Sequence, residues 1–297
     1  MSKRFIQFEL WKDCKQGCPF CCNRGQRPIN KAESIKYVLD KLNELEPNTY
    51  DYIGLIGGEF FNGEIDDYLY SFFVIMNRIN ELNPEKVFIT TSLLFDIKDS
   101  LVPVLQTLKR LFNMEKKIVL CTSWDKEWRF GNGQQALWSK NMLWLKNHFP
   151  DVELHTEMIL TQPLIDSVIS GEIDLNLFKQ IFRCNIDFIE PSSGLWFKNK
   201  YDCNNQLPGF FPTKASFIEF LKVVKDEVDL DNLLSMELRS EELYYIDNGE
   251  RKVAKNRRQG DGRCEISNKN VAYDIGFIDS DIPMRDVVIQ FKEIING

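Results

Sequence analysis

Several features are scarce in this 297-residue sequence, and each scarcity excludes a class of protein. No apolar run approaches the ~20 residues that a membrane-spanning helix needs, so a transmembrane protein is not expected. With 16 Gly and 11 Pro, the composition is unlike that of fibrous or low-complexity proteins. Basic residues are not in excess: 37 Lys and Arg stand against 44 Asp and Glu, and the net charge of −7 argues against general nucleic-acid or membrane-surface binding.

The N-terminal segment also lacks the apolar core of a signal peptide, because Gln7, Glu9 and Lys12 interrupt it. We therefore expect a cytoplasmic protein. In that compartment disulfides are rare, so the eight cysteines indicate metal binding or catalysis instead. The hydrophobic fraction of 43% is enough for a sizeable core.

A repeated strand-then-helix pattern occupies the first two-thirds of the chain. Six short segments rich in β-branched and aromatic residues are predicted strands: Phe5–Trp11, Tyr50–Ile56, Lys86–Ser92, Lys117–Ser123, Val152–Leu160 and Ile186–Glu190. Helical spacing of apolar residues, such as Ile35, Val38 and Leu42, fills the intervals between the first five of them. This pattern predicts an α/β fold, a partial (β/α)6 TIM-like barrel, with a doubly wound open sheet as the alternative.

We expect two regions, a barrel over residues 1–192 with a cysteine loop at 14–22, and a C-terminal extension over 193–297 packed on it. The extension contains an aromatic stretch, Ser192–Pro212, which is a candidate substrate lid, and a predicted helix over Thr213–Val228. Polar residues alternate along two predicted strands: Gln7, Glu9, Glu153, His155 and Glu157. They predict a partly open barrel lumen that holds a polar ligand, or else edge strands with one solvated face.

The most informative motif is Cys14-Lys-Gln-Gly-Cys18-Pro-Phe-Cys21, directly after the first predicted strand. Three thiolates in one short loop can bind a single metal centre. A structural zinc site is normally closed by four ligands, whereas a cubane iron–sulfur cluster held by three cysteines keeps one iron open to another molecule. Zinc bound with Cys22 or a distant cysteine stays an alternative.

This loop resembles the cysteine loop of the radical S-adenosylmethionine (radical SAM) superfamily. In that family C-x3-C-x2-C follows the first strand of a partial (β/α)6 barrel, and an aromatic residue, here Phe20, precedes the third cysteine. Gly57-Gly58-Glu59 resembles the family's GGE motif, although Phe60 stands where proline is usual. Ser123-Trp124-Asp125 with Arg129 resembles a further pattern at the fourth strand.

The resemblance implies that Cys14, Cys18 and Cys21 bind a [4Fe-4S] cluster whose open iron is chelated by S-adenosylmethionine. It also implies that the GGE segment contacts the methionyl amino group, Ser123 the ribose and Arg129 the carboxylate. The implied protein is an oxidoreductase-type enzyme that receives an electron from a donor such as flavodoxin or ferredoxin and forms a 5′-deoxyadenosyl radical.

Substrate and hydrogen-atom donor are less defined by the sequence. A peptide or protein side chain is the favoured substrate because the extension is long and aromatic-rich. A nucleotide or nucleoside is the alternative, based on a basic segment that includes Arg257 and Arg258. Cys203 and Cys264 are candidate hydrogen-atom donors. A non-catalytic, zinc-stabilised binding module remains a different class of interpretation.

Overall fold

A computed structural model gives the fold of the chain. It describes residues 4–11, 14–21, 30–62, 66–114, 117–125, 127–131, 133–193, 197–230, 233–234, 242–247, 250–255, 263–265 and 272–296. No helix within these ranges combines the length and apolar character needed to cross a bilayer.

The described chain is organised around an eight-stranded sheet in the order β6-β5-β4-β3-β2-β1-β7-β8. Its first six strands are parallel and adjacent in chain order: β1 (Phe5–Trp11), β2 (Tyr52–Gly57), β3 (Lys86–Thr90), β4 (Ile118–Trp124), β5 (Glu153–Ile159) and β6 (Asn185–Ile189). The predicted α/β fold, a partial (β/α)6 barrel with an attached C-terminal part, is confirmed. The sequence pattern located the bounds of each strand to within two residues.

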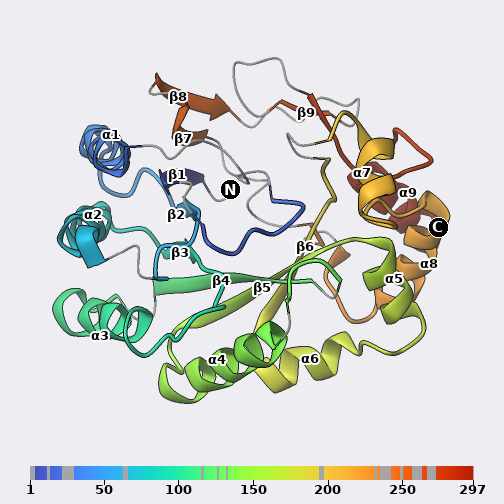
Figure 1. The fold of residues 1–297 in the computed structure, drawn as a ribbon, viewed down its shortest axis with the longest axis horizontal. Coiled ribbons are helices and arrows are strands. Elements are labelled where there is room, and N and C mark those ends of the chain that lie inside the picture. Colours follow the sequence, from blue (N-terminus) through green and yellow to red (C-terminus); the bar gives the residue numbers. More distant parts are fainter. Residues whose placement is uncertain are drawn as a thin grey trace.

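Helices lie along the outer side of the curved sheet (Figure 1). Between the strands they are α1 (Lys31–Glu44), α2 (Leu69–Leu82) after the short 3-10 helix η1 (Asp66–Tyr68), α3 (Leu101–Phe112), α4 (Gln134–His148), α5 (Gln162–Ile169) and α6 (Leu175–Phe182). The periodicity predicted helices at the positions of α1 to α4. It did not predict α5 and α6, which have eight residues each and begin at the side-chain caps Thr161 and Asp174.

The two faces of the parallel strands differ in chemistry. Apolar side chains of one face, such as Ile6, Phe8 and Leu154, join the main hydrophobic core with the helices. The opposite face carries the alternating polar residues, because successive side chains of a strand point to opposite sides. The register aligns His155 with Cys121 and aligns Glu157 with Ser123 across β4 and β5.

Both strands that carry these polar residues lie inside the sheet, since β1 is paired with β2 and β7, and β5 with β4 and β6. The alternative interpretation, solvated edge strands, is therefore wrong. The polar residues line the face of the sheet that the outer helices do not cover, as a barrel lumen requires.

The C-terminal part of the chain adds to the barrel at both of its edges. Next to β1 lies the hairpin of β7 (Glu242–Asp247), which is parallel to β1, and β8 (Glu250–Lys255). On the side of β6 lie α7 (Lys200–Gln206), α8 (Lys214–Val224) and α9 (Met284–Asn296). The strand pair β9 (Arg263–Glu265) and β10 (Ala272–Asp274) joins the segment after β6, where the Ser193 N–H donates to the Asp274 carbonyl over 2.9 Å. The predicted helix over Thr213–Val228 is found as α8, which packs against α5 and α9.

Candidate functional site

The cysteine loop begins just beyond the carboxyl end of β1, the end at which parallel β/α barrels place their chemistry. Gly17 adopts a positive φ of 63°, a conformation that side chains disfavour, and the Cys21 N–H donates to the Cys18 carbonyl over 3.1 Å. Cys14 is exposed, Cys21 is half-buried and Cys18 is buried. Cys22 lies outside the described residues.

The surroundings of these thiols suit a bound cationic group. Although Cys14 as a whole residue is exposed, partial desolvation of its thiol raises the pKa, and the nearby charges of Glu59, Cys18 and Cys21 act in the same direction. Burial also raises the pKa of Cys18, while the Arg129 guanidinium partly opposes it. The thiolate is the form of cysteine that binds metal. A cationic iron–sulfur centre would stabilise the thiolate form of these three side chains, so they fit such a group. In the described ranges no three His, Cys, Asp or Glu side chains are arranged around a single-ion site.

The segment Gly57-Gly58-Glu59 follows β2 beside the end of β1, where Gly57 is in register with Trp11. Gly57 has a φ of 139°, which only glycine adopts readily. The Glu59 side chain is buried and accepts hydrogen bonds from the Phe61 N–H (3.0 Å), the Thr91 hydroxyl (3.1 Å) and the Ser92 N–H. Glu59 thus joins the turn after β2 to the end of β3, and burial raises the pKa of its carboxyl group.

The turn after β4 approaches the cysteine loop. Asp125 Oδ1 accepts from three successive backbone N–H groups, those of Glu127 (3.0 Å), Trp128 (2.6 Å) and Arg129 (3.2 Å). From this turn Arg129 Nη1 reaches Cys18 Sγ at 4.0 Å, and Arg129 Nε is buried with no hydrogen-bond partner. Ser123 lies one strand position before Trp124, at the end of β4 and beside Glu157 of β5.

An aromatic contact connects the same loop to the C-terminal part of the chain. Phe20 stacks on Phe210 with ring centroids 5.7 Å apart, and the edge of Trp128 meets Phe210 at 5.6 Å. Sequence reasoning marked Phe20 and the aromatic stretch separately and missed that they touch. No local signal could have shown it, because the contact joins segments nearly two hundred residues apart.

Cys203 belongs to the same apolar cluster, with Leu207, Phe210 and Phe211. Its side chain is fully buried, and desolvation, with a smaller contribution from Asp202, raises its pKa to about 12. A thiol with this pKa is neutral at physiological pH. The side chain of Cys264, the second candidate donor, lies outside the described residues, as do Arg257 and Arg258 of the basic segment.

His155 lies deeper on the lumen face and is held between two carboxylates. Its Nδ1 is 2.6 Å from Asp187 Oδ2 and its Nε2 is 2.8 Å from Glu153 Oε1. Lys86 and Asn185 also donate to Glu153, over 2.7 and 2.9 Å. Burial alone would lower the pKa of His155, but the two carboxylates outweigh it and raise the pKa to about 9.

These interactions make His155 an imidazolium with both nitrogens already bonded. The hydrogen bond with His155 lowers the pKa of Glu153 to about 2, with Lys86 adding to the effect. Glu157 is buried on the same face, closer to the cysteine loop, and is better placed than His155 for contact with a ligand. The alternating pattern predicted that Glu153, His155 and Glu157 line the lumen, and it gave no indication of Asp187 or Asn185.

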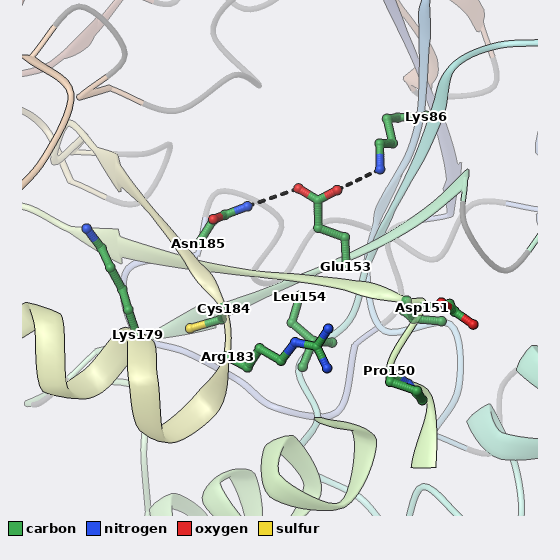
Figure 2. Close-up of a pocket in the computed structure, with 10 residues that line it drawn as sticks. Lys86, Pro150, Asp151, Glu153, Leu154, Lys179, Arg183, Cys184 and Asn185 are labelled. Carbon is green, nitrogen blue, oxygen red and sulfur yellow. Dashed lines mark hydrogen bonds and ion pairs between the residues drawn. The ribbon is translucent and has the colours of Figure 1, made fainter. Parts of the chain in front are cut away.

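A surface depression lies at the opposite end of the sheet, where β5 and β6 begin (Figure 2). Lys86, Glu153 and Asn185 line it together with Arg183 and Lys179, and the dashed contacts in Figure 2 are those of Glu153. It is at the amino ends of the strands, so it is separate from the cysteine loop.

Comparison with known proteins gives similarity at the level of solved structures. No protein-family model matches the sequence, and no curated protein does. Solved structures do resemble the chain. Native anSMEcpe with bound AdoMet and Cp18Cys peptide gives a TM-score of 0.48 and 17% identity over 75% of this chain and 59% of that one. SuiB of Streptococcus suis gives a TM-score of 0.38 and 11% identity over 76% and 53% of the two chains. The chain thus spans little more than half the length of these proteins.

Proposed function

We propose that this protein is a radical SAM enzyme that carries a [4Fe-4S] cluster on Cys14, Cys18 and Cys21. The observation that carries the proposal is the convergence of three thiols of one short loop with the Gly57-Gly58-Glu59 turn and Arg129 at the carboxyl end of a parallel half-barrel. A loop with three thiolates leaves a fourth iron open to S-adenosylmethionine.

Held by these residues, the cluster and S-adenosylmethionine would supply the reductive radical chemistry that removes a hydrogen atom from the substrate. The chain's own residues bind and orient. Gly57 and Gly58, without side chains, leave room for a close approach of the ligand to the backbone. Ser123 and Glu157 face the lumen beside each other and are suited to bind hydroxyl groups.

The aromatic stretch that includes Phe210 is the proposed lid. Phe20 of the cysteine loop and Trp128 of the turn after β4 contact it, and Lys200, near the middle of the stretch, forms an ion pair with Asp281 (2.7 Å). A lid of this kind excludes water from a radical intermediate. The length and aromatic content of the extension favour a peptide or protein side chain as the substrate over a nucleotide or nucleoside.

The proposal is tested by anaerobic reconstitution with iron and sulfide, followed by dithionite and S-adenosylmethionine. We expect about four irons per chain, a brown protein and 5′-deoxyadenosine as a product. Cys14→Ala, Cys18→Ala and Cys21→Ala should each abolish product formation, whereas Cys121→Ala, a buried thiol on β4, should retain it. One zinc per chain without colour would instead establish the metal-stabilised binding module.

A further inference from the structure

An arginine from the turn after β4 reaches into the cysteine loop. Arg129 Nη1 donates toward Cys18 Sγ over 4.0 Å, between residues 111 positions apart in the sequence. Cys18 is the buried cysteine of the motif, so this contact takes place away from bulk solvent. In a low-dielectric environment a guanidinium acts strongly on a neighbouring sulfur ligand.

The backbone that carries Arg129 is fixed by Asp125. A single carboxylate oxygen of this buried side chain accepts the N–H groups of Glu127, Trp128 and Arg129. Trp128, the residue before Arg129, is held in turn against Phe210. The turn therefore holds the backbone from which the Arg129 side chain starts, and the buried Nε shows that this side chain runs inward and not into solvent.

The guanidinium also has an N–H donor without a hydrogen-bond partner. Among the described residues Arg129 forms no ion pair, and its buried Nε has no hydrogen-bond partner. Buried donors are normally satisfied, so the unpartnered Nε of a guanidinium whose Nη1 contacts Cys18 points to a ligand that belongs at this place.

We propose that Arg129 sets the reduction potential of the iron–sulfur cluster by donating a charge-assisted hydrogen bond to the sulfur of Cys18. The proposal rests on the proposed function, since it requires the cluster. Positive charge and N–H donors near the sulfur ligands stabilise the reduced, more negative form of a cluster, so Arg129 raises the potential. This is a different role from the contact with the S-adenosylmethionine carboxylate that the family resemblance implies, because it operates before that molecule binds.

The test is a redox titration of the reconstituted protein without S-adenosylmethionine, followed by electron paramagnetic resonance of the reduced cluster. Arg129→Gln and Arg129→Met should both shift the midpoint potential to more negative values, while Arg129→Lys, which keeps the positive charge, should remain near the wild type. Arg110→Gln, an exposed position on α3, removes the same charge far from the loop and should cause no shift. An unchanged potential in both neutral variants would overturn the proposal.

A second variant separates the role of Arg129 from a general effect on the loop. Asp125→Ala removes the acceptor that fixes the turn, and it also removes a negative charge that acts on Cys18. In the Arg129→Gln background only the loss of that charge remains, so Asp125→Ala should give a more negative potential change in the wild-type background than in the Arg129→Gln background. Additive shifts would contradict this account.

The experiment distinguishes a failure of the Arg129 proposal from a failure of the proposed radical SAM function. If the wild-type protein binds no iron–sulfur cluster, the proposed function is wrong and the titration has no signal. If the wild type binds about four irons per chain and the variants differ only in affinity for S-adenosylmethionine, the enzyme assignment stands. Only the potential-setting role of Arg129 is then overturned.

Discussion

The buried imidazolium of His155 leads to a prediction about stability and pH. His155 bonds Asp187 on β6 and Glu153 on its own strand, while Lys86 of β3 and Asn185 of β6 complete the network around Glu153. The pKa of His155 is raised from 6.5 to about 9 in the folded protein. We expect His155→Gln to destabilise the fold by an amount that depends on pH.

The magnitude follows from the linkage between proton binding and folding. The change in pKa corresponds to about 3 kcal/mol, at about 1.4 kcal/mol per pKa unit. The side chains of Glu153 and Asp187 are 35% and 18% exposed, so solvent screens part of the interaction. We therefore expect about 2–3 kcal/mol. Because the folded-state pKa is raised, this stabilisation is complete below about pH 6.5 and is lost as the pH rises through about 9.

The assay compares urea unfolding of the wild type and His155→Gln at pH 6 and pH 9.5, at equal cluster loading. The difference in unfolding free energy between the two proteins should be about 2–3 kcal/mol larger at pH 6 than at pH 9.5. His148→Gln, on the exposed side of α4, controls for the loss of an imidazole elsewhere. Equal destabilisation by His155→Gln at both pH values would refute the reasoning, since packing and not charge would then account for it.

Three further predictions concern the site itself. Glu59→Gln should lower the thermal unfolding midpoint and the iron content together, because an amide cannot accept all the N–H and O–H donors that converge on this carboxylate; an unchanged melting curve would argue against it. Phe210→Ala should cost about 3–5 kcal/mol and accelerate bleaching of the cluster in air, measured by visible absorbance, and Phe5→Ala, a buried ring remote from the loop, should destabilise without faster bleaching. Cys203→Ser should leave 5′-deoxyadenosine formation intact, because the thiol is fully buried in an apolar cluster with Phe210 and Phe211; loss of that product would place Cys203 in the cleavage step.

The sequence determined the parts of the protein that depend on local pattern. Period-two and period-3.6 spacing located the six strands and the four longer helices, because burying one face of each element imposes that spacing. The cysteine loop was also readable, since its three thiols and Gly17 are contiguous. The shorter helices α5 and α6 were not, because eight residues give too few turns for a clear period.

Tertiary structure decided what joins residues that are distant in the sequence. The hairpin of β7 and β8 extends the sheet at β1, and its sequence contains nothing that specifies this partner. Nothing in the sequence specifies three further contacts either: Arg129 with Cys18, Phe210 with Phe20, and Asp187 with His155. Each pair depends on strand order and on the direction in which each turn leaves the sheet. Those are properties of the packed chain, because they are set by which surfaces are buried together and not by the spacing within any one segment.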